Sequence, residues 1–332
     1  MASRLLTPGE LETLIDGSLE DERAVLTRSG LGSLAADLEA GRFLEQSITR
    51  LLLADILILS RATTGDARNF LIFWTRRHEF TNLKTLLRGR MAQATQQEIR
   101  AQLADLGSFS TLPVDELLRT EDMAELLRRL ETTPYADMVR FARRAFERQP
   151  SLFALDSALN RRYYHGLVRH ARPLEQAAGR AFSGLMAQLI DRVNLVWMLR
   201  YRHAYGLQPS EVFFLLIPAG YRLKSGLLKV LAMLPRLEDV LAGLPAPYSD
   251  WLARAATIDA VFRILDEQLA RTARAVLQSA APAIARTFAY LILRERDLRR
   301  VRAALTGRAL GIAPDIIRQA VGLGPAVIAA AA

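Results

Sequence analysis

The chain has 332 residues, of which 51% are hydrophobic and 24% charged, which is enough apolar material for large cores and too much for a disordered protein. It contains no cysteine, which excludes disulfides, thiolate nucleophiles and cysteine-built zinc or iron–sulfur sites. The net charge of +9 invites a nucleic-acid partner, but the basic residues are spread among acidic ones, and an acidic membrane surface or acidic partner explains the charge as well.

The predicted elements are helices along the whole chain. A capping box at Thr7 and Glu10, with Pro8 at the first helical position, predicts a helix from the N-terminal region. Residues 123–130 place leucines on one face and charged side chains on the other, which predicts a second amphipathic helix. Hairpin signals and alternating strand patterns are nearly absent. The sequence therefore predicts an all-α fold.

No segment is predicted to cross a membrane. The apolar run 51–59 is shorter than the roughly 20 residues that a spanning helix needs, and it contains Asp55. The longer stretch 212–234 contains Arg222, Lys224 and Lys229. The first residues also lack the apolar core of a signal peptide.

Three short patterns recur in the same order along the chain. The first has aliphatic residues at i and i+4, an acid at i+1 and an arginine at i+6, and it begins at Leu44, Leu155 and Leu265. The second is Asn-Leu followed by an aliphatic–arginine step, at 82–88 and 194–200, with a weaker copy at 297–302. The third is an acid–aliphatic pair with a glycine about nine residues later, and its three copies are Glu98-Ile99 with Gly107, Glu211-Val212 with Gly220, and Asp315-Ile316 with Gly324.

The constant order and the offset of about 110 residues predict three diverged copies of one helical unit. We expect repeat one at 1–135, repeat two at 136–247 and repeat three at 248–332. Residues 7–15 resemble the closing part of a unit, around 120–127, so we expect repeat one to lack its leading helix.

Residues suited to catalysis or metal binding do not form a recognisable site. His165 and His170 are five residues apart, which is off the helical spacing for a shared metal, and neither His78 nor His203 lies in a metal-binding motif. The chain has no phosphate-binding glycine loop and no nucleophile elbow. We predict no catalytic, cofactor-binding or metal-binding residue, and the partner-binding residues are unknown.

Several polar residues have a structural and a functional interpretation. Glu79 and Asp191 could be paired carboxylates, but each lies three residues before the asparagine of the second pattern, which favours a structural role. Residues 161–164, Arg-Arg-Tyr-Tyr, mix basic and aromatic side chains as nucleic-acid platforms do. In a helix the same string more often places tyrosines in the core and arginines outside. Asn82 and Asn194 are expected to tie helix ends to their neighbours.

The segment 76–89, Arg-Arg-His-Glu-Phe-Thr-Asn-Leu-Lys-Thr-Leu-Leu-Arg-Gly, resembles the signature of the central-stalk subunit of V-type and archaeal-type ATPases, called C in prokaryotes and d in eukaryotes. Further similarity lies at 153–164, 190–195, 216–221 and 294–302. The resemblance covers about residues 5 to 323, and the triplication is a trait of the family. Members usually open with a further helix before the part that resembles residues 3–7, so a natural start upstream of Met1 is expected.

The resemblance implies a non-catalytic rotor subunit in which three helical units form a funnel. Its base would rest on the proteolipid ring, and its cavity would receive the central-shaft subunits D and F, so that torque passes between them. It implies one copy per complex, no cofactor, no nucleic acid, membrane contact only through the ring, and a peripheral place on the cytoplasmic face of the cell membrane. The alternatives are an unrelated α-helical scaffold or a basic nucleic-acid-binding helical protein.

Overall fold

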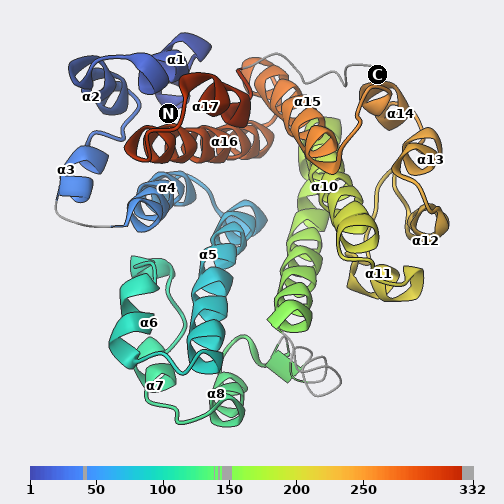
Figure 1. The fold of residues 1–332 in the computed structure, drawn as a ribbon, viewed down its shortest axis with the longest axis horizontal. Helices are drawn as coiled ribbons and strands as arrows, with labels where there is room; N and C mark the ends of the chain where they lie inside the picture. Colours follow the sequence, from blue (N-terminus) through green and yellow to red (C-terminus); the bar gives the residue numbers. More distant parts are fainter. Residues whose placement is uncertain (40–42, 138, 141–142, 144–151, 324–332) are drawn as a thin grey trace. The chain divides into compact units, whose positions relative to one another are not determined.

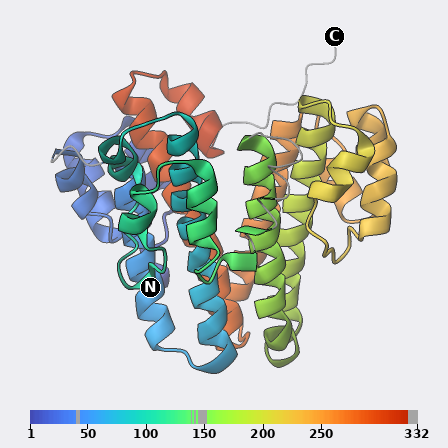
Figure 2. The same cartoon turned by 90° about the horizontal axis from the view of Figure 1, so that it is seen from below.

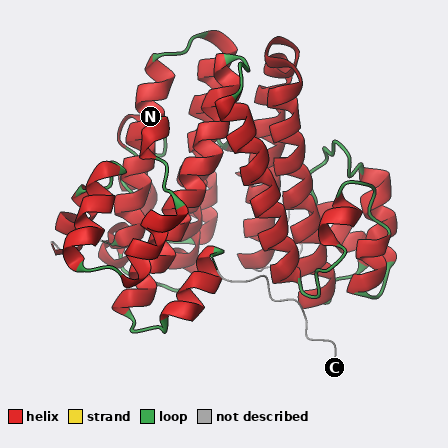
Figure 3. Cartoon of the chain, turned by 90° about the horizontal axis from the view of Figure 1, so that it is seen from above, coloured by secondary structure: helices red, strands yellow, loops and turns green. Residues whose placement is uncertain are grey.

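A computed structural model describes residues 1–39, 43–137, 139–140, 143 and 152–323. Every regular element in these residues is a helix (Figure 3), which confirms the predicted all-α fold. No helix in these ranges is long and apolar enough to cross a membrane. Gly324, the last glycine of the third sequence pattern, lies outside the described residues.

The chain divides into two compact units, and the division falls inside helices α4 (Leu44–Arg61) and α10 (Leu152–Leu199). One unit is Thr49–Arg172. Besides parts of α4 and α10, it holds α5 (Gly65–Met91), α6 (Gln96–Gln102), η2 (Gly107–Phe109), α7 (Val114–Leu118) and α8 (Met123–Leu130) (Figure 1).

The other unit joins Met1–Ile48 to Pro173–Ala332. Its N-terminal elements are η1 (Ala2–Arg4), α1 (Pro8–Asp16), α2 (Leu19–Arg28) and α3 (Ser33–Glu39). The remaining elements, after the second part of α10, are η3 (Arg200–Ala204), α11 (Pro209–Leu215), α12 (Ser225–Met233), α13 (Leu237–Ala242), α14 (Tyr248–Leu252), α15 (Ile258–Gln278), α16 (Ala283–Ala309) and α17 (Pro314–Val321).

Local sequence signals place several helix boundaries. The capping box of Thr7 and Glu10 is present at the start of α1, and α8 begins after the N-cap Asp122, which confirms both predicted helices. Gly179 interrupts α10 with φ 62° and ψ −158°, a conformation that a residue with a Cβ rarely adopts. The long α10 is therefore two helices joined at this glycine.

The core of the Thr49–Arg172 unit forms where α5 meets the first part of α10. The rings of Phe73 and Tyr163 stack with centroids 5.8 Å apart, and Phe80 meets Tyr163 edge-on at 5.5 Å. A Cβ on Gly166 would lie 2.4 Å from Phe73 Cζ, so only glycine allows α10 to approach this closely. Tyr163 is 4% exposed, so it is a core residue rather than part of a stacking platform.

In the other unit, α16 is the most buried element. It forms an antiparallel hairpin with α15 and is covered by α1 and α17 (Figures 1 and 2). Phe288 of α16 packs on Phe182 of α10 with ring centroids 5.4 Å apart. Two charged side chains of α16 are buried: Arg294 is 1% exposed and Asp297 is 6% exposed.

The three sequence patterns fall on corresponding elements. The first lies on α4, α10 and α15, the second on α5, α10 and α16, and the third on α6, α11 and α17. One alignment was wrong: Ile317, which is 3% exposed, takes the buried place of Ile99 and Val212, whereas Ile316 is 58% exposed. The domain boundaries 1–135, 136–247 and 248–332 stay a prediction.

The acid of the first pattern bonds an arginine from a helix that carries the second pattern. The pairs are Arg88 with Asp156, Arg192 with Asp266 at 2.5 Å and Arg302 with Glu45 at 3.0 Å. Burial opposes the ionisation of Asp266, but Arg192, Arg299 and Arg296 outweigh it and lower the pKa of its carboxyl. The pair at Asp266 is the best shielded from solvent, so it is expected to contribute most.

Candidate functional site

Glu79 on α5 holds the segment that leads into α7. Its carboxylate, 1% exposed, accepts hydrogen bonds from the backbone N–H groups of Thr111 and Leu112, the latter at 2.8 Å. Tyr135 O–H donates to the same carboxylate, and Arg76 Nη1 pairs with it at 2.6 Å. Burial, and then Glu79, raises the pKa of Tyr135, so this hydroxyl stays protonated as a donor. We call this cluster the α5 clamp.

Asp191 on α10 makes an equivalent cluster, which we call the α10 clamp. Its carboxylate accepts hydrogen bonds from the backbone N–H groups of Tyr221 at 3.1 Å, Arg222 at 2.9 Å and Leu223 at 3.3 Å. The Tyr248 hydroxyl donates a fourth hydrogen bond at 3.0 Å. Burial raises the pKa of the Asp191 carboxyl, although these donors oppose the rise. Every donor comes from the chain that follows α10. Both carboxylates are thus occupied by the protein's own groups and are not available for acid–base chemistry.

The two asparagines of the second pattern hold backbone in both directions. Asn82 accepts from Ala104 N–H at 2.9 Å and donates to its carbonyl at 2.8 Å. Asn194 accepts from Ile217 N–H at 2.8 Å and donates to the Ala219 carbonyl at 3.0 Å. A buried amide that satisfies a donor and an acceptor of a passing chain fixes that chain's path on the helix.

Each of the four histidines has its own set of neighbours. Burial, and then Arg77, lowers the pKa of His78 to about 3, so its ring is neutral near pH 7. Burial and the surrounding arginines lower the pKa of His165, and the His170 ring stacks on Phe73 with centroids 4.4 Å apart. His203 also has a lowered pKa because of burial and Arg202. Among the described residues, no three His, Asp or Glu side chains are grouped to hold a metal.

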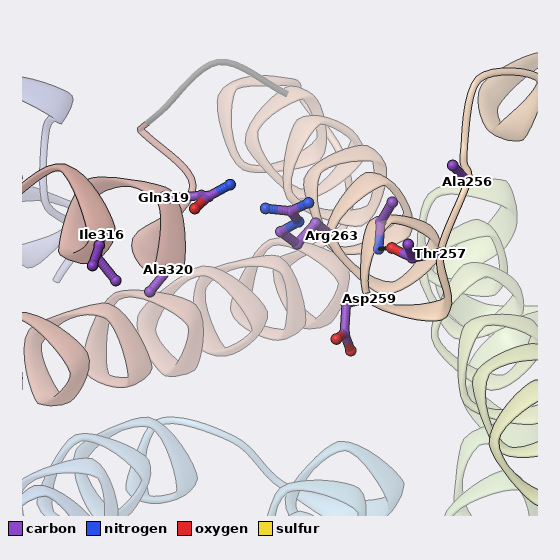
Figure 4. A pocket seen from close by; sticks show the side chains of 8 residues that line it. Ala256, Thr257, Asp259, Arg263, Ile316, Gln319 and Ala320 are labelled. Carbon is purple, nitrogen blue, oxygen red and sulfur yellow. Dashed lines mark hydrogen bonds between the residues drawn. The ribbon is translucent and has the colours of Figure 1, made fainter. Parts of the chain in front are cut away.

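Open apolar grooves flank α17. One of about 450 Å³ has walls of Ala256, Ala260, Ile316 and Ala320, with Arg263 reaching in from α15 (Figure 4). The second, of about 410 Å³, lies against α16 and shares Ile316. We call these the α17 grooves.

Exposed aliphatic side chains distinguish this surface. Ile316 is 58% exposed, Ile312 39% and the nearby Leu310 71%. Arg299 and Arg302 line the second groove, so an apolar strip is bordered by cations. An apolar surface with a polar border is typical of a protein-binding site. No pattern in the sequence predicted it, because these isoleucines have the spacing of core residues.

A family profile described as ATP synthase (C/AC39) subunit matches residues 1–320. The chain belongs to this family, whose members are non-catalytic subunits of rotary ATPases. The C subunit of the A-type ATP synthase of Methanosarcina barkeri is 24% identical over 327 residues, covering 96% of this chain and 89% of the relative. That of Halobacterium salinarum is 24% identical over 329 residues, covering 90% and 91%. That of Methanocaldococcus jannaschii is 23% identical over 330 residues, covering 95% and 82%.

Membership confirms the resemblance found in the sequence and means that the chain works beside other subunits of an ATP synthase complex. The α5 and α10 clamps lie on the segments that carried the resemblance, 76–89, 190–195 and 216–221. At Glu79, Asn82, Asp191 and Asn194, which are at most 4% exposed, these family motifs therefore support the fold from within.

Proposed function

We propose that the chain is the rotor subunit that couples the proteolipid ring of a V/A-type ATPase to the central-shaft subunits D and F. In this role three helical units surround one axis as a funnel, and torque passes through them. One copy per complex would lie on the cytoplasmic face of the cell membrane. The match along residues 1–320 to the ATP synthase (C/AC39) subunit family carries the proposal.

The internal clamps support a mechanical role. A coupling must not yield when its ends are twisted in opposite directions, and packed helices resist such deformation. Glu79 and Asp191 add hydrogen bonds from a buried charge to backbone N–H groups, which are stronger than bonds between neutral groups. The short helices α6–α8 and α11–α14 are thereby attached firmly to α5 and α10.

The α17 grooves are the surface on which we propose that another subunit of the complex docks. Their walls suit the apolar face of a helix, and Arg263 suits a carboxylate at the border of that face. Arg263 reaches into the first groove (Figure 4), where its guanidinium can pair with a carboxylate from outside. The occupant is therefore expected to be an amphipathic helix with an acidic residue beside its apolar stripe.

Affinity purification of the tagged chain from its own membranes tests the role. We expect proteolipid and ATPase head subunits to co-purify, with one copy of this chain per complex. Ile316→Asp and Arg263→Glu should reduce that recovery, whereas Leu19→Asp, which changes a leucine on α2 that is 69% exposed, should leave it unchanged. A chain that is recovered alone from intact membranes would contradict the rotor role.

A further inference from the structure

The second sequence pattern has reversed chemistry on α16. Arg294 and Asp297 take the places that Glu79 and Asn82 hold on α5 and that Asp191 and Asn194 hold on α10. Arg294 Nη1 donates to the Arg4 carbonyl at 3.1 Å, and Asp297 Oδ2 accepts from Leu6 N–H at 2.9 Å. On α5 and α10 the held backbone lies 22 to 33 residues after the side chain that holds it. On α16 the held backbone lies about 290 residues before that side chain.

Helix α17, which packs on α16, also contacts the N-terminal residues where its counterpart α6 contacts the chain that follows it. A Cβ on Gly307 would lie 2.7 Å from Ile317, and a Cβ on Gly89 would lie 2.4 Å from Ile99, so α17 packs on α16 as α6 packs on α5. Next to these isoleucines, Arg100 bonds an acid on α7, namely Asp115. The corresponding arginine of α17 bonds acids on α1 instead.

Those acids are Glu12, at 2.9 Å from Arg318 Nε, and Asp16. Arg308 of α16 adds bonds to the carbonyls of Leu14 and Gly17, both at 3.2 Å. These carbonyls lie at the C-terminal end of α1, where they have no partner within the helix. A single guanidinium thus caps α1 from outside.

Residues 1–28, which we call the N-terminal arm, also hold their own shape. Arg28 Nη2 donates to the Leu5 carbonyl at 3.1 Å and its guanidinium pairs with Glu10. Arg308 reaches past the end of α1 to Glu22 on α2 at 2.7 Å. Leu11, Leu14 and Ile15 are at most 3% exposed, so α1 also contributes an apolar face.

We infer that the surface of α16 and α17 is a binding site for a separate polypeptide segment, and that its occupant is the N-terminal arm. The arm closes the third helical unit as the chain after α5 closes the first. Arg294, Asp297 and Arg308 recognise backbone groups of the arm. Arg318, and Arg308 through Glu22, recognise its carboxylates. Because each contact is made directly by the arm, the covalent link from the arm to α4 is not needed for binding. This inference does not depend on the rotor role.

Cleavage of the folded full-length chain tests it. A protease site inserted between Gly41 and Arg42 would release residues 1–41 as a fragment. We expect the fragment to stay bound through size-exclusion chromatography at micromolar concentration. Arg318→Glu should weaken its binding at least tenfold, and Glu12→Arg with Asp16→Arg in the fragment should restore most of the loss. Matched cleaved chains carrying Arg100→Glu, which changes the equivalent arginine on α6, should bind the fragment normally.

Amide hydrogen exchange provides the second readout. An excess of a synthetic peptide of residues 1–28 should displace the fragment. Loss of the fragment should raise amide hydrogen exchange in α16 and α17, while α5–α8 stay protected. Separation of the fragment from the cleaved parent chain on the column would overturn the inference. So would exchange in α16 and α17 that is the same with and without the fragment.

Discussion

Glu79 on α5 and Arg294 on α16 are the central buried charges of two comparable regions, and they hold opposite ends of the peptide group. Glu79 binds N–H groups of residues 111 and 112, whereas Arg294 binds the carbonyl of Arg4. Both are 1% exposed. The second sequence pattern thus keeps one role at this position, which is to hold a second segment on a long helix. It does not preserve the sign of the charge or the origin of the segment.

The largest expected effect is that of Glu79→Ala. It would remove the carboxylate that accepts from the N–H groups of Thr111 and Leu112, the second of which is buried. The Tyr135 hydroxyl and the Arg76 guanidinium would lose their bonds to the same carboxylate. Removing one partner of a buried ion pair lowers the free energy of unfolding by about 3–5 kcal/mol. Urea unfolding followed by tryptophan fluorescence should show this loss, and Glu79→Gln should lose less because its carbonyl still accepts. A loss below about 1 kcal/mol would mean that the clamp does not stabilise α5.

The matching change on α16, Arg294→Met, should cost about 2–3 kcal/mol. It keeps the length of the buried side chain and removes one charged donor from the Arg4 carbonyl, whose loss is that of a charge-assisted bond. Differential scanning calorimetry of the variant measures the change. If this variant is as stable as the parent chain or more stable, Arg294 does not stabilise the fold by holding the N-terminal residues.

His78 lies on α5 and should make the stability of that region depend on pH. Its folded-state pKa of about 3 lies below the ordinary value of 6.5, so the neutral ring favours the folded state. Its contribution is present above pH 6.5 and is lost as pH falls from 6.5 toward 3, by about 2 kcal/mol at pH 5. His78→Phe should remove this part of the change between pH 7.5 and 5 in chemical denaturation. An unchanged pH profile would mean that His78 is not the buried neutral group.

The smallest expected effect is that of Asp297→Asn. The amide oxygen can still accept from Leu6 N–H, so a loss of about 0.5–1 kcal/mol is expected. Asp297→Leu, which cannot accept, is the comparison variant and should lose more. Thermal melts of both variants test whether the hydrogen bond or the charge matters, and equal losses would point to the charge.

The sequence predicts the helices, the order of the patterns and the capping box at Thr7 because these are local signals. It also predicts that residues 7–15 resemble the closing part of a unit, which stays a prediction, and in the structure α1 packs on α16. The partner of that segment was not predictable, since a contact across about 290 residues leaves no local periodicity. Ile316 and Ile317 differ by one step of a helix, and only packing against Gly307 shows which is buried.

The α17 grooves escaped prediction for a related reason. Ile312 and Ile316 are apolar at helical spacing, which is the pattern of a core. Their exposure depends on what covers α17, and the described residues leave that side open. Hydrophobicity alone therefore could not separate a core position from a docking surface.

Hydrogen exchange of Glu79→Ala and Arg294→Met, measured side by side with the parent chain, tests most directly whether each long helix holds its own second segment. We predict faster exchange at residues 104–118 in Glu79→Ala and at residues 1–28 in Arg294→Met, with the other region protected in each case. Faster exchange of both regions in both variants, or of neither, would contradict this prediction.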